Sequence, residues 1–127
     1  MNTTKKLYRF LEGNDMKVHL YKTASGKDLI LEYIESLSPP EIADGYSILQ
    51  KFKNDELDEL KIKHWRGRIW EVYFYKHNRI FYVYIDGENV YFLHACRKQK
   101  NKTERSDSDI IVKRAKALGD TLSKKFI

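Results

Sequence analysis

Apolar residues recur along the chain at two different spacings, and the change between them divides the sequence. Up to about residue 60 most of them recur every three to four positions, which is the spacing of one face of an α-helix. Beyond that point they alternate with polar residues, as in a β-strand with one buried face. The pattern therefore predicts helices first and a sheet afterwards, with one short strand before the helices and one more helix after the sheet.

The predicted elements are short and closely spaced. Strands are expected at residues 16–21, 62–64, 69–75, 79–85 and 90–97, and helices at residues 29–37, 42–52 and 108–118. Ser38-Pro39-Pro40 separates the first two helices, because proline is tolerated in a first helical turn but not in a helix interior. We expect an α+β fold in which an antiparallel β-sheet meander has its helices packed on one face.

This arrangement leaves the other face of the sheet open to solvent or to a partner. Alternation along the strand at residues 69–75 places Trp70 and Val72 on the core face and Glu71 and Tyr73 on the open face. The open face is therefore expected to carry the functional side chains.

The length of 127 residues suits one hydrophobic core. We expect residues 16–127 to form a single domain, preceded by a leader or short docking helix at residues 1–15. Cys96 is the chain's one cysteine, so no disulfide can form within the chain and a reducing compartment is favoured. No apolar run is long enough for a signal peptide or a membrane span, which predicts a cytoplasmic protein without membrane contact.

The net charge of +6 is concentrated in the middle of the chain. Residues 1–60 carry a net charge of −3, residues 61–105 carry +7 and residues 106–127 carry +2. Such a basic block favours a polyanionic partner such as nucleic acid. A solvated basic surface without a partner is the alternative interpretation.

Common motifs for metals, phosphates and nucleophiles are missing from the sequence. The four histidines do not recur at the spacing of metal ligands, and there is no glycine-rich phosphate loop or Gly-x-Ser-x-Gly element. We therefore expect no metal and no cofactor. His94 and Cys96 lie in an apolar strand, where burial in the core is the expected role.

Cations and aromatic side chains are interleaved along the predicted strands, and this combination suits RNA. Cations neutralise phosphates, and aromatic rings stack on the bases of single-stranded RNA. Metal-free RNA cleavage uses the 2′-hydroxyl as nucleophile and needs a base, a cation and an acid around the phosphate. Glu71 is the one carboxylate inside the basic strands. It is a candidate general base, or else an ion-pair partner of Arg79 or Arg68.

Three segments carry a family resemblance. They are Ile69-Trp70-Glu71-Val72, Arg79-Ile80-Phe81-Tyr82 and Phe92-Leu93-His94-Ala95-Cys96-Arg97-Lys98. Their order and spacing resemble the RelE/ParE toxin superfamily, and most closely its HigB branch, the phage-derived Gp49-like proteins, over roughly residues 16–118. The resemblance implies a RelE-like microbial ribonuclease fold, cleavage of messenger RNA in the decoding site of the ribosome, and neutralisation by a helix-turn-helix, HigA-like antitoxin.

The resemblance also implies roles for individual residues. Arg79 matches the family's phosphate-binding arginine, Lys98 matches the basic residue that ends the last strand, and Trp70 and Glu71 match a Trp-Glu pair. The catalytic candidates are Arg79, Lys98, Glu71 and Arg68. The RNA-binding candidates are Lys63, His64, Trp65, Arg66, Tyr73, Arg97, Lys100 and Lys102.

The chain departs from the family pattern at three positions. Tyr73 stands where the family has an arginine, Gln99 replaces a second lysine, and Cys96 replaces a phenylalanine. Lys100 and Lys102 are close enough in sequence to restore the lost charge. The departure at Tyr73 implies a slower toxin, or one that distributes the catalytic roles differently.

Two other functions fit the same sequence. A ParE-like toxin has the same fold but poisons DNA gyrase and cleaves no RNA. A non-catalytic RNA-binding module would use the basic sheet only as a platform. The sequence does not separate these from a ribonuclease, because one fold can carry several functions.

Overall fold

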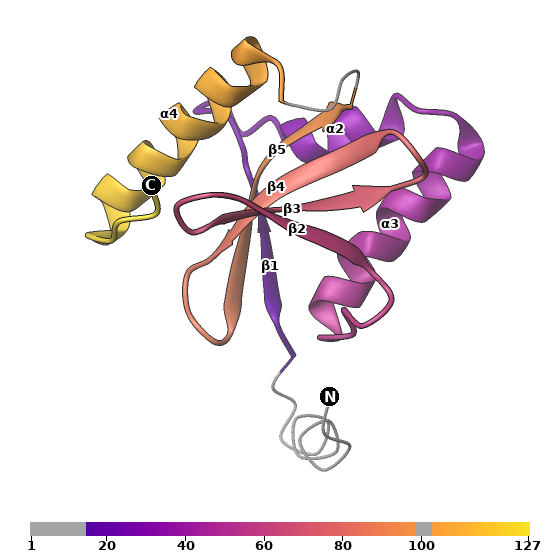
Figure 1. Ribbon diagram of the computed structural model, residues 1–127, viewed down its shortest axis with the longest axis horizontal. Coiled ribbons are helices and arrows are strands. Elements are labelled where there is room, and N and C mark those ends of the chain that lie inside the picture. Colours follow the sequence, from indigo (N-terminus) through magenta and orange to yellow (C-terminus); the bar gives the residue numbers. More distant parts are fainter. Residues whose placement is uncertain (1–14, 99–102) are drawn as a thin grey trace.

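The computed structural model describes residues 15–98 and 103–127, and Figure 1 shows their arrangement. In chain order the elements are β1 (Lys17–Leu20), α2 (Leu29–Glu35), α3 (Pro39–Lys53), β2 (Lys61–Arg66), β3 (Ile69–Phe74), β4 (Asn78–Tyr84), β5 (Asn89–Arg97) and α4 (Arg105–Leu122). The type and order of the predicted elements agree with this list. The predicted leader (all but its last residue) and the candidates Lys100 and Lys102 lie outside the described residues.

Local chemistry explains where the first two helices begin. The Asp28 carboxylate accepts a hydrogen bond of 2.9 Å from the Leu31 backbone N–H and so caps the start of α2. Proline occupies the first turn of α3, where its missing N–H costs nothing. Within the described ranges, no helix is both long and apolar enough to cross a membrane.

The described strands form one five-stranded sheet in the order β1-β5-β4-β3-β2. Each of the pairs β2–β3, β3–β4 and β4–β5 is antiparallel, as predicted, whereas β1 pairs with β5 in parallel. The sheet is therefore mixed. A parallel pair needs a long connection between its two strands, and everything from α2 to β4 lies between β1 and β5.

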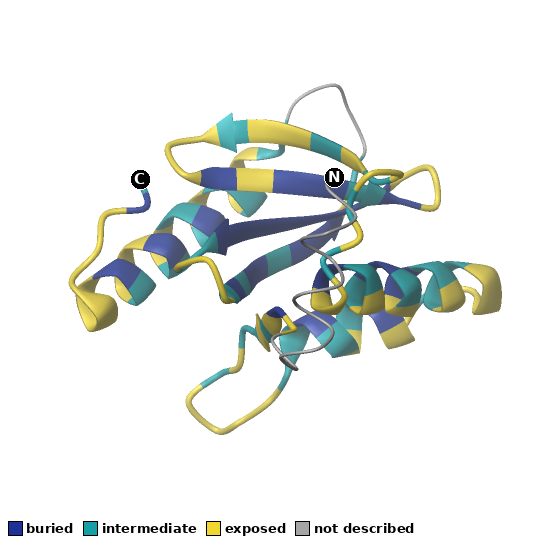
Figure 2. Ribbon diagram, turned by 90° about the horizontal axis from the view of Figure 1, so that it is seen from below, coloured by how far each residue is buried: buried dark blue, intermediate teal, exposed yellow. Residues whose placement is uncertain are grey.

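Helices cover both faces of the sheet, so the expectation that they pack on one face was wrong. One apolar core lies under α2 and α3 and includes Ile34 and Phe52. A second core lies under α4 and includes Ile111 of that helix together with Phe126 near the C-terminus. Figure 2 shows the consequence, since the central strands are largely buried while the edge strand β2 is largely exposed. β4 is apolar on both faces, and each apolar face needs its own cover.

Trp70 corrects a second expectation, because its side chain is 40% exposed rather than in the core. Its neighbour Ile69, expected on the open face, is completely buried in the core under α4. Trp70 instead packs edge-on against His64 of β2, with ring centroids 5.1 Å apart. Both residues are large and apolar, so the sequence could not show which of them a helix would cover.

A bulge interrupts the pairing of β4 with β5 and decides which residues of β5 face α4. Phe81 pairs with His94, but the next residue, Tyr82, pairs with Phe92, so Leu93 is the extra residue. Leu93 and His94 consequently both face α4. The alternation then resumes and puts Cys96 on that same face.

Candidate functional site

A buried ion pair lies on the α4 side of the sheet. Glu71 on β3 is 3% exposed and Arg79 on β4 is 2% exposed. Arg79 Nη1 donates to Glu71 Oε2 at 3.2 Å, and the Tyr73 hydroxyl donates to Glu71 Oε1 at 2.6 Å. Both carboxylate oxygens are therefore engaged. Of the two partners that the sequence allowed for Glu71, the structure selects Arg79 rather than Arg68.

The hydrogen-bond donors of the Arg79 guanidinium are only partly paired. Its Nε and Nη2 atoms are buried and have no hydrogen-bond partner among the described residues. Folded proteins rarely leave buried donors unpaired, because each loses its hydrogen bonds to water and regains nothing. A guanidinium with two free N–H groups on adjacent nitrogens is suited to binding two oxygens of one phosphate. The guanidinium also lies 5.2 Å from the centroid of the Phe81 ring and interacts with the Cys96 thiol, so its two remaining nitrogens can donate to an anion only where one reaches them.

Tyr73 lies between the ion pair and two lysines. Lys98 Nζ is 5.0 Å and Lys61 Nζ is 5.7 Å from the centroid of its ring. Burial and the hydrogen bond to Glu71 raise the pKa of the Tyr73 hydroxyl, so it keeps its proton at neutral pH. The aromatic face thus gathers positive charge while the hydroxyl contacts the buried carboxylate.

An open cleft of about 530 Å³ lies beside Tyr73. Its lining is rich in lysine and includes two acidic residues, and comprises Asp44, Ile48, Lys51, Glu59, Leu60, Lys61, Lys63, Tyr73, Phe74, Tyr75, Lys76 and Lys98. Tyr75 and Lys76 form the turn between β3 and β4 with positive φ angles of 39° and 65°. Asp44 holds this turn by accepting a 2.7 Å hydrogen bond from the Tyr75 N–H. The cleft offers a basic channel beside Arg79 for a polyanion.

Four predicted candidates therefore lie close to Arg79 or line this cleft: Glu71, Tyr73, Lys63 and Lys98. Lys63 stands directly opposite Glu71 across β2 and β3. The sequence analysis missed Lys51, Lys61 and Lys76 as cleft residues. The sequence shows that these residues are charged, but the three side chains come together only because α3, β2 and the β3–β4 turn lie side by side in the fold.

The remaining described candidates lie elsewhere. The Arg66 guanidinium stacks on the Trp65 ring at 4.5 Å, and Trp65 packs on Phe81 in the core under α4. Arg68 lies in the β2–β3 turn, where its backbone N–H donates to the carbonyl of Phe126 at 2.8 Å.

Two more of these candidates make local contacts. The His64 ring lies 2.8 Å from the carbonyl of Gly67, and Arg97 forms an ion pair with Glu41 of α3 at 3.1 Å. None of Arg66, Arg68, His64 and Arg97 lines the basic cleft.

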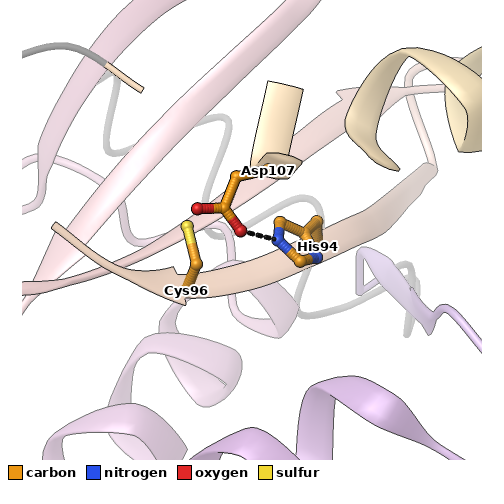
Figure 3. Close-up of side chains that lie close together, drawn as sticks. All are labelled: His94, Cys96 and Asp107. Atoms are coloured by element: carbon orange, nitrogen blue, oxygen red, sulfur yellow. Dashed lines mark hydrogen bonds and ion pairs between the residues drawn. The ribbon is translucent and has the colours of Figure 1, made fainter. Parts of the chain in front are cut away.

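A second polar group, which the sequence analysis did not identify, lies on the same face of the sheet. His94, Cys96 and Asp107 point toward one another, with His94 Nε2 at 2.8 Å from Asp107 Oδ1 (Figure 3). Burial lowers the pKa of His94 and raises the pKa of the Cys96 thiol to about 11. Asp107 comes from α4 and is 13 positions from His94, so no sequence spacing signals the group.

Comparison with known proteins adds one finding to this geometry. A protein-family model described as phage-derived protein Gp49-like matches residues 32–116, which is about two-thirds of the chain. Among curated proteins, none matches the chain significantly. The matched range includes the whole ion pair, Tyr73, Lys98 and the second polar group.

Proposed function

Because the chain belongs to the phage-derived Gp49-like family of RelE/HigB-like toxins, we propose that it is a toxin that cleaves messenger RNA on the ribosome in the cytoplasm. A helix-turn-helix antitoxin neutralises it. One observation carries the ribonuclease assignment: buried Arg79 keeps two donor nitrogens unpaired beside a lysine-rich cleft. An RNA phosphate supplies the acceptor oxygens that these donors lack.

The proposed reaction needs no metal. The 2′-oxygen of the RNA attacks the adjacent phosphorus, and the bond from phosphorus to the 5′-oxygen of the next nucleotide breaks, which leaves a 2′,3′-cyclic phosphate. The Arg79 Nε and Nη2 groups donate to the phosphate oxygens and stabilise the charge that develops there. The Lys98 ammonium protonates the departing 5′-oxygen.

Glu71 has two roles in this scheme, since it positions Arg79 and is also the final acceptor of the 2′-proton. Its Oε2 accepts from Arg79 and fixes the direction of the guanidinium, while its Oε1 accepts from Tyr73. We assign the 2′-proton to the Tyr73 hydroxyl, which takes it while passing its own proton to Glu71. This gives Tyr73 a catalytic role at the position where the family has an arginine.

The ribosome holds the RNA substrate in the orientation that the reaction needs. Arg79 is almost completely buried and does not line the cleft, so a phosphate reaches it only after neighbouring side chains move aside, and RNA that is not held in place seldom does so. Fixing the messenger RNA in the decoding site supplies that orientation before the reaction starts. We therefore expect slow cleavage of free RNA and fast cleavage of messenger RNA on translating ribosomes.

The test is to incubate programmed ribosomes with the protein and map the new RNA ends. Wild-type protein should cut within the decoding site, and a folded Arg79→Ala/Lys98→Ala double variant should not. Arg66→Ala is the matched control, because this arginine lies away from the cleft. Binding without new ends would indicate an RNA-binding module, and inhibition of gyrase supercoiling without RNA cleavage would indicate a ParE-like toxin; either result overturns the proposal.

A further inference from the structure

The group formed by His94, Cys96 and Asp107 combines an imidazole, a thiol and a carboxylate. Their ligand atoms all lie within 4.8 Å of one another, and the side chains point to a common centre (Figure 3). We propose that these three residues bind a divalent transition-metal ion of the zinc class. The site adjoins Arg79, whose cross-strand partner is Cys96, but the proposal does not depend on RNA cleavage.

The fold builds this group from two elements. The bulge in β5 turns His94 and Cys96 toward α4, and Asp107 lies in the first turn of that helix. Cys96 is buried, and the side chains of His94 and Asp107 are only 12% and 21% exposed. The ligands are thus held on packed secondary structure, which limits the rearrangement that binding requires.

The distances suit a tetrahedral ion after small side-chain rotations. Zinc lies about 2.3 Å from sulfur and about 2.0 Å from nitrogen or oxygen, so tetrahedral ligand atoms stand roughly 3.3–3.6 Å apart. In the metal-free arrangement, His94 Nε2 and Asp107 Oδ1 are 2.8 Å apart and the widest separation is under 4.8 Å. Three protein ligands leave a fourth position for water. A set with a thiolate and an imidazole selects zinc or cobalt over magnesium or calcium.

Proton and charge balance also permit binding. Without metal, His94 Nε2–H donates to Asp107, and its Nδ1 accepts from Arg114 Nη1 at 3.3 Å. The ion takes the place of the Nε2 proton, which moves to Nδ1, and the Cys96 thiol releases its proton to solvent. Thiolate and carboxylate together balance the two positive charges of the ion.

Two cations oppose metal binding, Arg79 and Arg114, and Arg114 is the one in direct contact with His94. It presents a donor to His94 Nδ1, although a metal-bound histidine normally gives its second N–H to an acceptor. Arg114 Nη1 also donates to the Leu93 carbonyl at 2.8 Å, so it keeps one partner when the His94 contact is lost. Removing this cation should therefore strengthen metal binding.

The experiment titrates the metal-free, full-length protein with Co²⁺, whose absorption reports its ligands. We expect one ion per chain, visible bands of tetrahedral cobalt, a thiolate-to-cobalt charge-transfer band in the near ultraviolet, and loss of all of these when Zn²⁺ is added. Cys96→Ser should abolish the charge-transfer band, and Asp107→Asn should weaken binding by about tenfold or more. Arg114→Gln should strengthen it, and His77→Gln, at the turn before β4, should change nothing.

Circular dichroism of each variant checks that it is folded. Absence of the charge-transfer band in folded wild-type protein overturns the proposal, as does the same band in Cys96→Ser. If Cys96→Ser does not fold, the proposal is tested by the cobalt spectrum of the wild-type protein and by whether Arg114→Gln raises or lowers the affinity for cobalt. Weaker binding by Arg114→Gln would count against the site. None of these readouts involves RNA, so a failed ribonuclease assignment leaves this test intact.

Discussion

Asn78 and Arg79 are neighbours on β4, and both are buried, yet their side chains face opposite sides of the sheet. On the α2–α3 side, Asn78 Oδ1 accepts from the Tyr33 hydroxyl at 2.6 Å and its Nδ2 donates to Glu41 at 2.7 Å. On the α4 side, Arg79 donates to Glu71 but leaves two nitrogens without partners in the described structure. The α2–α3 side thus holds a completed polar network and the α4 side an incomplete one.

We propose that the difference separates a structural role from a functional one. In the Asn78 network, hydrogen bonds from Asn78 and Ser38 hold the pKa of Glu41 below its usual value. A completed network contributes stability and fixes how the helices sit on the sheet. The Arg79 network leaves two buried donors unpaired, so we expect replacement of the whole ion pair to remove activity with little loss of stability, whereas replacement of one partner should lower both.

The largest effect is expected when the buried ion pair is broken on one side only. Arg79→Met leaves Glu71 charged and buried, which should lower the free energy of unfolding by about 3 kcal/mol. Replacing both residues, in Arg79→Met/Glu71→Met, should restore most of that loss, because no unpaired charge remains. Urea unfolding of the two variants measures this. A double variant as unstable as the single one would show that the pair stabilises the fold.

The next effect concerns cleavage. Arg79→Lys keeps the charge but removes the planar arrangement of donors, and we expect single-turnover cleavage on programmed ribosomes to fall roughly 100-fold to 1000-fold. The fold should survive, as judged by circular dichroism. Asn78→Ala serves as the comparison on the other face and should cleave at close to the wild-type rate per folded molecule. If Arg79→Lys and Asn78→Ala lowered the cleavage rate equally, the Arg79 network would have no functional role that the Asn78 network lacks.

Asn78→Ala should act on stability instead. It removes the side-chain hydrogen bonds of a buried residue to Tyr33, Glu41 and the Tyr75 carbonyl, so we expect a loss of about 2 kcal/mol in unfolding free energy. Thermal or urea unfolding measures this loss. Asn78→Asp keeps the acceptor for Tyr33 but places a carboxylate beside Glu41, and should be at least as unstable.

Alkaline pH should weaken the α2–α3 side by a smaller amount. Burial raises the pKa of Tyr33 to about 12, whereas the unfolded chain ionises near its ordinary value of 10. Below pH 10 the contribution of Tyr33 is fully present, and it is lost as the pH rises toward 12, at about 1 kcal/mol per pH unit. Tyr33→Phe should unfold with a shallower pH dependence between pH 9 and 11. An unchanged slope would contradict the raised pKa.

The smallest effect separates the cleft from the rest of the basic surface. Lys63→Gln removes a cleft lysine opposite Glu71, and should lower ribosome affinity by roughly threefold to tenfold with a weaker dependence on salt. Arg66→Gln removes the same charge from a position three residues further along β2, where the side chain stacks on Trp65, and should stay within about twofold of wild type. Equal effects would indicate binding by overall charge alone.

Much of the fold could be predicted from the sequence. Alternation and helical spacing indicated the type and order of the elements, and Ser38-Pro39-Pro40 marked the boundary between the first two helices. The pairing of Glu71 with Arg79 was also among the predicted alternatives, because Glu71 is the one carboxylate inside the basic strands. These features depend on neighbours along the chain or on the simple alternation of a strand.

Other features required contacts between distant segments. The position of α4 on the second face decided that Ile69 would be buried, while Trp70 on the other face stays largely exposed beside β2, although both residues are apolar. The cleft lysines come from α3, β2, the β3–β4 turn and the end of β5, and no local pattern brings them together.

The bulge at Leu93 shows most clearly why the sequence alone did not determine which side chains share a face of the sheet. The sequence determined that this segment would be a buried strand, but strict alternation from Phe92 would send His94 and Cys96 toward α2 and α3. One extra residue in the pairing with β4 turns both side chains toward α4 and Asp107. Because side chains on a strand alternate with a period of two, a shift of one residue reverses every face that follows. That choice is made by pairing and packing, which only the tertiary structure contains.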